Sequence, residues 1–112
     1  MANKVTPTPY FENKFKRLSK KFRSLAKDIL ALEDLLIADP TLGESLGAGM
    51  YKIRLANKDK GKGKSGGFRV ITYLIKENDE ENEIFLITIY DKSEEENIIK
   101  SDLVKLINDL LD

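Results

Sequence analysis

Residues 50 to 56 read Met50-Tyr51-Lys52-Ile53-Arg54-Leu55-Ala56, in which apolar and basic side chains alternate from Tyr51 onward. This alternation predicts a β-strand with one buried face, because successive side chains of a strand point to opposite faces of the sheet. Tyr51, Ile53 and Leu55 are expected to face the core. Lys52 and Arg54 should therefore share the opposite face, where two cations lie close together.

Two further strands are expected after this one. Segments 68–75 and 84–90 are rich in Ile, Val, Thr, Tyr and Phe, which favour strands. The connectors between the three strands, 57–67 and 77–82, contain Gly, Asn and Asp and are short enough for antiparallel hairpins. Segment 42–49, which carries three glycines, is expected to be a loop that leads into the first strand.

Two helices are expected before the strands. From Glu12 onward, apolar residues recur at helical spacing among many Lys and Arg residues, which predicts a basic amphipathic helix. Ser24 is expected to cap a second helix that ends at Asp39-Pro40, because the residue before a proline is disfavoured in the helical conformation. The expected apolar positions are Phe15, Leu18 and Phe22 in the first helix and Leu25, Ile29, Leu32, Leu35 and Leu36 in the second.

The two ends of the chain complete the expected order of elements. Residues 1–9 are interpreted as an irregular arm that leads into a very short strand near Tyr10 and Phe11. Ser101 is expected to cap a last helix over 102–111. The order (β)ααβββα predicts an α+β fold with a small antiparallel sheet, a helical hairpin and a C-terminal helix. The helices are expected to cover one face of the sheet and to leave the other open. The expected buried face of the last helix comprises Leu103, Leu106, Ile107 and Leu110.

Composition narrows the classes of function. The 112 residues are 41% hydrophobic and 34% charged, which is typical of one soluble domain, here taken as 1–112. The chain has no Cys and no His, which excludes disulfides, Cys/His zinc sites and nucleophiles activated by histidine. We expect no metal and no cofactor. No stretch approaches the roughly 20 apolar residues of a membrane span, and no signal peptide is evident, so a cytoplasmic protein is expected.

Charge is distributed unevenly along the chain although the net charge is zero. Residues 1–76 carry 16 Lys or Arg against 7 Asp or Glu, whereas residues 77–112 carry 3 against 12. A stretch as basic as the first is a candidate surface for binding a polyanion. The acidic part can keep the protein soluble or shield that surface.

A lysine-rich loop follows the first strand of the sheet. Its end, Gly63-Lys64-Ser65, resembles the end of the phosphate-binding motif GxxxxGK[ST]. However, Lys58 stands where the first glycine is required, and a strand follows instead of the helix whose N-terminus would hold the phosphate. The loop is suited to contact a nucleic-acid backbone through point charges, although a solvated hairpin loop has the same composition. The candidate RNA-binding residues are Lys58, Lys60, Lys62 and Lys64.

Two more cations extend the basic face. Arg69 begins the second expected strand and Lys92 follows the third. A single surface cation is usually just solvated, but four that converge on one face, the other two being Lys52 and Arg54, predict an anion-binding site. The carboxylates at 94–96 could in principle be catalytic, but a charged loop after a strand explains them more simply.

The chain resembles the RelE/ParE superfamily of toxins. The segments Tyr51 to Ala56, Gly61 to Tyr73 and Leu86 to Glu94 look like its successive strands, and the similarity runs in order from about Phe11 to the last helix. The closest likeness is to RelE and HigB-like mRNA interferases. It implies a toxin of a bacterial toxin-antitoxin system that enters the ribosomal A site and cuts mRNA without a metal. It also implies a cognate antitoxin that blocks the basic face, with the toxin monomeric alone and oligomeric with its antitoxin.

The resemblance also implies roles for individual residues. Lys52, Arg54, Arg69 and Lys92 occupy the places of the family's catalytic basic residues. The tyrosine that some members carry falls near Ile98 here, so Tyr90, Lys52 and Glu94 are the candidates for general acid and base.

Two other functions compete with mRNA cleavage. One is a ParE-type toxin that binds DNA gyrase without cutting nucleic acid, and the other is an RNA-binding module with no activity. The basic set argues for the nuclease, because ParE-type members generally lack it.

Overall fold

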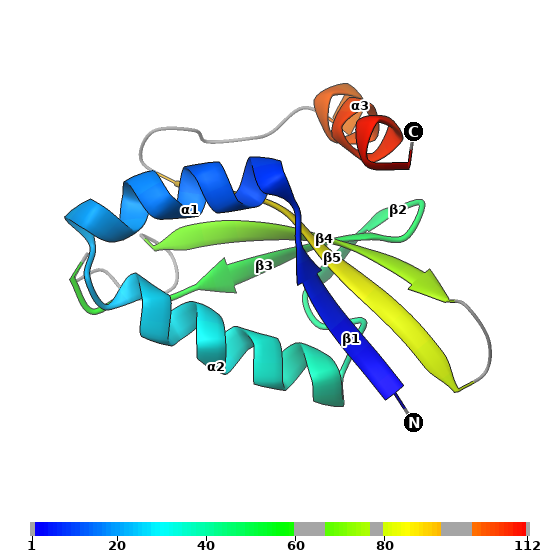
Figure 1. Ribbon diagram of the computed structural model, residues 1–112, viewed down its shortest axis with the longest axis horizontal. Helices are drawn as coiled ribbons and strands as arrows, with labels where there is room; N and C mark the ends of the chain where they lie inside the picture. Colours follow the sequence, from blue (N-terminus) through cyan, green and yellow to red (C-terminus); the bar gives the residue numbers. More distant parts are fainter. Residues whose placement is uncertain (1, 60–66, 77–79, 93–99, 112) are drawn as a thin grey trace.

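The computed structural model describes residues 2–59, 67–76, 80–92 and 100–111, and its helices and strands form an α+β fold (Figure 1). This confirms the predicted fold class. None of the helices within these ranges is both long and apolar enough to cross a membrane. The elements are β1 (Ala2–Pro7), α1 (Pro9–Lys21), α2 (Leu25–Ala38), β2 (Glu44–Gly47), β3 (Met50–Leu55), β4 (Phe68–Lys76), β5 (Glu81–Asp91) and α3 (Lys100–Leu111).

The strands form one sheet in the order β1-β5-β4-β3-β2. The antiparallel pairs β3–β4 and β4–β5 were predicted from the sequence and are confirmed. Two pairings were not predicted: β1 lies parallel to β5, and β2 lies antiparallel to β3. The sheet is therefore mixed, with a parallel strand at one edge.

The prediction that residues 1–9 form an irregular arm is wrong. Residues 2–7 form β1, whereas Tyr10 and Phe11, where a strand was expected, lie in α1. The helix begins three residues before Glu12 because Thr8 caps it: the Thr8 hydroxyl accepts a hydrogen bond from the Phe11 amide at 3.2 Å. Pro9 then takes the first helical position, which suits its fixed φ angle and missing N–H.

Helices α1 and α2 cover one face of the sheet, and their apolar side chains form the larger core. The rings of Phe22 and Phe68 pack edge to face at 5.1 Å between centroids. One expected core position is wrong: Leu35 is 57% exposed, because Leu32 and Leu36 already fill the side of α2 that faces the sheet. The buried members of this core are Phe11, Leu18, Phe22, Leu25, Ile29, Leu32, Leu36, Ile53, Phe68, Val70, Ile84, Leu86 and Ile89.

Helix α2 begins and ends where the sequence predicts, but Ser24 does not cap it with its side chain. Asp59 does so from the segment after β3: its Oδ2 accepts hydrogen bonds from the Ser24 amide at 3.0 Å and from the Ser24 hydroxyl at 2.8 Å. These two hydrogen bonds, the backbone one first, lower the pKa of Asp59. The buried Asn57 amide donates to the Ser24 hydroxyl and to Asp28, so the end of β3 is tied to the first turn of α2.

Helix α3 packs on the opposite face of the sheet from α1 and α2. Leu103 and Ile107 form a second core there. The expectation that this face is open along its whole length is therefore wrong. The helix also begins at Lys100, so Ser101 lies inside it and is not its cap. Leu106 is partly buried against this core, whereas the side chain of Leu110 lies outside the described residues. The buried sheet residues of this core are Met50, Ile71, Ile87 and Tyr90.

The segment expected to be a loop before β3 contains the short strand β2. Gly47, Ala48 and Gly49 form the turn, all with positive φ angles of 86°, 54° and 83°. This run of left-handed residues folds β2 back onto β3, so that Glu44 lies opposite Lys52.

Candidate anion-binding site

Three of the expected site residues form a row across the sheet. Arg54 on β3 lies directly opposite Arg69 on β4, and Arg69 lies directly opposite Tyr90 on β5. Directly opposite residues of antiparallel strands share a face and have Cβ atoms roughly 4.5 to 5.5 Å apart. The three side chains therefore start from adjacent points on the face that also carries α3.

A bulge in β5 brings Tyr90 onto this face. Ile71 pairs with Thr88 whereas its neighbour Thr72 pairs with Leu86, which leaves Ile87 as an extra residue. An extra residue in one strand shifts the alternation of the side chains beyond it. Ile87 and Tyr90, three positions apart, consequently belong to the same core cluster.

Arg69 is only 5% exposed, which is unusual for an arginine. One of its guanidinium nitrogens, Nη1, donates a hydrogen bond to the carbonyl of Phe68 at 3.2 Å. Like charges placed directly opposite each other on neighbouring strands are destabilising, and burial increases the effect. The Arg54–Arg69 pair concentrates positive charge at this point of the sheet, which favours the binding of an anion.

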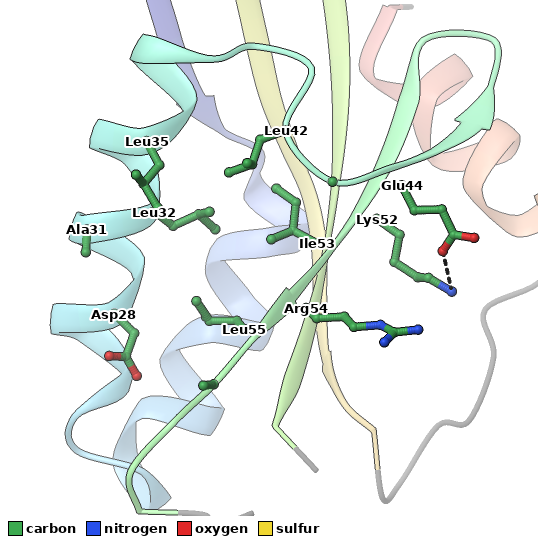
Figure 2. Close-up of a pocket in the computed structure, with 12 residues that line it drawn as sticks. Asp28, Ala31, Leu32, Leu35, Leu42, Glu44, Lys52, Ile53, Arg54 and Leu55 are labelled. Atoms are coloured by element: carbon green, nitrogen blue, oxygen red, sulfur yellow. Dashed lines mark ion pairs between the residues drawn. The ribbon is translucent and has the colours of Figure 1, made fainter. Parts of the chain in front are cut away.

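Lys52 lies two positions before Arg54 in β3 and therefore on the same face of the sheet. Its Nζ is 3.5 Å from Oε2 of Glu44 on β2. Figure 2 shows Lys52 and Arg54 both pointing away from α2, as the alternation of β3 predicts. Glu44 thus brings a carboxylate to the basic site, and the sequence analysis missed it by treating 42–49 as a loop. The run Gly47-Ala48-Gly49, flanked by apolar residues, is a hairpin signal that could have located it.

Lys92 follows the end of β5, next to the row formed by Arg54, Arg69 and Tyr90. Its backbone amide donates to the carbonyl of Gly67 at 3.3 Å, which extends the β4–β5 pairing by one position. Lys92 is exposed, in the turn that directly follows β5.

The remaining expected residues are only partly covered by the structure. Lys58 is exposed in the segment that follows β3. The other three lysines of the loop, at 60, 62 and 64, and the carboxylates at 94–96 lie outside the described residues. The structure therefore brings together Lys52, Arg54, Arg69, Tyr90 and Lys92, and leaves the role of the lysine loop a prediction.

This arrangement is suited to bind a phosphate. Guanidinium groups form two parallel hydrogen bonds with phosphate oxygens, and two of them start from neighbouring strands here. A third cation, Lys52, is held beside them by Glu44. Among the described residues, Glu44 adds a carboxylate to this positive charge.

Comparison with known proteins finds a family whose model matches most of the chain. The family model described as "RelE toxin of RelE / RelB toxin-antitoxin system" matches residues 10–108 of the chain. Among solved structures, the chain is similar to an arginine double mutant of the E. coli toxin RelE in the free state. The TM-score is 0.58 at 20% sequence identity, and the match covers 94% of this chain and 97% of the other.

Proposed function

The chain belongs to the RelE family of toxins of toxin-antitoxin systems, and from this premise we propose that it is an endoribonuclease that cuts mRNA on the ribosome. As a member of this family it is a toxin, and its partner is a cognate antitoxin. The observation that carries the proposal is the pair of directly opposite arginines, Arg54 and the buried Arg69. This pair concentrates positive charge and is suited to bind a phosphate.

RNA supplies its own nucleophile for this reaction. The 2′-hydroxyl oxygen attacks the adjacent phosphorus, and the bond from phosphorus to the 5′ oxygen of the next nucleotide breaks. The products are a 2′,3′-cyclic phosphate and a 5′-hydroxyl. A protein accelerates this step by aligning the groups and by stabilising the extra negative charge of the transition state. We assign that stabilisation to Arg54 and Arg69, with Lys52 beside them.

The proton of the 2′-hydroxyl needs an acceptor. A protonated lysine has no lone pair with which to accept it, whereas a carboxylate does. Because Glu44 faces Lys52 at 3.5 Å, we assign the acceptor role to Glu44 and charge stabilisation to Lys52. Lys92, exposed after the end of β5, is suited to donate a proton to the departing 5′ oxygen. Tyr90, which is buried directly opposite Arg69, is suited to hold that arginine in place.

Translation in a cell-free extract tests the proposal. Primer extension on the mRNA should reveal new 5′ ends inside the coding sequence when the protein is added, and none with Arg54→Ala. Intact mRNA together with halted DNA supercoiling would favour a ParE-type toxin. Intact mRNA without any effect on supercoiling would leave only an RNA-binding module. Either result contradicts the proposal.

We further expect the lysine loop and the sheet face to use their charge differently. Replacing Lys58, Lys60, Lys62 and Lys64 with Gln should weaken RNA or ribosome binding and reduce its salt dependence, by a slope of roughly 0.7 for each phosphate that the loop no longer neutralises. Cleavage at saturating protein should stay nearly normal. Arg54→Ala should leave binding largely intact and slow the cut, because its interaction strengthens in the transition state.

Single-turnover rates at saturating protein separate these two roles. The Gln loop variant should cut nearly as fast as the unaltered protein, and Arg54→Ala should be slow. If the loop variant is as slow as Arg54→Ala, the loop lysines belong to the reacting site and this division of roles is wrong.

A further inference from the structure

Helix α2 exposes an apolar surface on its outer side. Its inner side packs on the sheet, and Figure 1 shows the helix at the border of the molecule. Three of the five large apolar side chains that are exposed among the described residues belong to it: Leu30 at 64%, Leu35 at 57% and Ile37 at 47%. Its exposed small residues are Ala26, Ala31 and Ala38. A helix that is apolar around most of its circumference is usually covered on more than one side, so the outer side of α2 is suited to a partner.

Two grooves run along the flanks of this outer side. One, of about 640 Å³, lies between α2 and β3 and is lined by Ala31 and Leu35. The other, of about 510 Å³, lies between α1 and α2 and is lined by Ala26 and Leu30. A partner that packs on the outer side of α2 can therefore place apolar side chains into a groove on either flank of the helix.

The outer side of α2 also carries two charges of opposite sign. Lys27 and Asp34 are the exposed charged residues of the helix. They are seven positions apart, close to two helical turns, so both point outward but lie about 10 Å apart along the axis. Within the described part of the chain, neither side chain forms an ion pair. Both charges are therefore available to a partner.

This arrangement of apolar and charged residues is complementary to itself. When two copies of α2 pack antiparallel about a twofold axis that passes between Leu30 and Ala31, these two residues of both copies meet at the centre. Lys27 of each copy then lies level with Asp34 of the other, because the two positions are equally far from the axis. The small side chain of Ala31 lets the helices approach closely. The same surface thus serves on both copies, as twofold symmetry requires.

We propose that the free protein forms a twofold-symmetric dimer through the outer sides of two antiparallel α2 helices. Leu30 of each copy is buried at the centre, and Lys27 of each copy pairs with Asp34 of the other. A contact between two single helices is small, so the dimer is reversible, with a dissociation constant in the micromolar range.

The dimer differs from the monomer that the resemblance to the family implied for the toxin alone. The candidate sites lie on the face of the sheet that carries α3, opposite to α2, so the contact leaves both of them uncovered. The inference therefore goes beyond the proposed function and does not rest on it.

Sedimentation velocity of the purified toxin without its antitoxin measures the oligomeric state. The protein should sediment as a monomer when dilute and at twice the mass of one chain when concentrated. Leu30→Glu should raise the dissociation constant about a hundredfold or more, because two carboxylates replace two leucines at the centre of the contact. Leu30 is exposed in the single chain, so this substitution leaves the core intact. Val104→Glu, at an exposed apolar position of α3, is the matched control and should dimerise normally.

Reversing the two charges tests the antiparallel arrangement. Lys27→Glu places a carboxylate level with Asp34 of the other copy, and Asp34→Lys places an ammonium group level with Lys27. Either substitution should raise the dissociation constant about tenfold, since two attractions become repulsions. Both substitutions in one chain restore the pairs, so the double variant should dimerise like the unaltered protein. Positions 27 and 34 are too far apart to interact within one helix, so this rescue can arise only between copies. Lys105→Glu, exposed on α3, is the matched control and should have no effect.

Several results would overturn the proposal. A protein that stays monomeric at every concentration forms no such dimer. A dimer that survives Leu30→Glu uses another surface, and a double variant that regains nothing excludes the antiparallel pairing of Lys27 with Asp34. A monomer whose Leu30→Glu variant instead binds the antitoxin more weakly would assign the outer side of α2 to the antitoxin. Cleavage of mRNA is measured separately, so the failure of the nuclease proposal would leave these results unchanged.

Discussion

Arg69→Ala is expected to slow mRNA cleavage about 10²- to 10³-fold, the typical effect of removing one preorganised hydrogen-bond donor to the transition state. Arg69 is 5% exposed, so its guanidinium is fixed before the substrate arrives. Arg69→Lys should also be impaired, because an ammonium group cannot form two parallel hydrogen bonds with a phosphate. Single-turnover cleavage on preassembled ribosomes measures the rate, and cells should survive expression of Arg69→Ala.

The control for this experiment is stability. Removing Arg69 takes a hydrogen bond from the Phe68 carbonyl and leaves space where a buried side chain was, so some loss of stability is expected. Urea unfolding should show that Arg69→Ala is still folded under the conditions of the cleavage assay, so that the loss of rate is not a loss of structure. Lys76→Ala, at the exposed far end of β4, should leave the rate unchanged. Full toxicity of a folded Arg69→Ala would remove this residue from the reacting site.

Gly43→Ala is expected to destabilise the fold by about 2 to 4 kcal/mol. Gly43 has a φ angle of +103°, which L-amino acids rarely adopt. An added Cβ would lie 2.6 Å from the backbone oxygen of Lys52 and 2.8 Å from Cγ1 of Ile53, so the chain must shift. The shift would move Glu44 away from Lys52. Thermal unfolding should show a midpoint lower by about 8 °C or more.

Gly49→Ala is the matched comparison for Gly43→Ala. Its φ angle is also positive, at +83°, but an added Cβ would lie 3.2 Å from the Leu74 carbonyl oxygen and from the Tyr73 ring. The strain in the backbone is therefore similar while the steric overlap is smaller. If Gly49→Ala loses as much stability as Gly43→Ala, close approach to β3 is not what requires glycine at position 43.

Local periodicity predicted those helices and strands that can be identified from the pattern of their own residues. The alternation of β3 and the helical spacing of α1 and α2 identified these elements, and hairpin-length connectors predicted the order β3, β4, β5. β1 was missed because it depends on pairing with β5, about 80 positions away, where local patterns carry no information. The start of α1 was missed although Thr8-Pro9 carries a capping signal, because the prolines were interpreted as breakers.

The candidate site was predictable only in part. The alternation of side chains along β3 placed Lys52 and Arg54 on one face of the sheet. Which residues of the neighbouring strands lie beside them depends on the register of strand pairing, which local sequence does not show. The row of Arg54, Arg69 and Tyr90 requires both hairpins and the bulge at Ile87 to be placed correctly. Nothing in the local sequence indicated that α3 would cover part of this face and that Arg69 would be buried.

The parallel pairing of β1 with β5 also governs when the fold can be completed. Residues 2–7 pair with residues 81–86, and the Thr8 hydroxyl donates to the carbonyl of Leu86 at 2.9 Å. Contacts so distant in sequence form late, because the intervening chain must first be closed into a loop. Tyr90 and Lys92 come later still in the chain. During its own synthesis the nascent chain therefore has no complete candidate site until residues 1–92 have been translated.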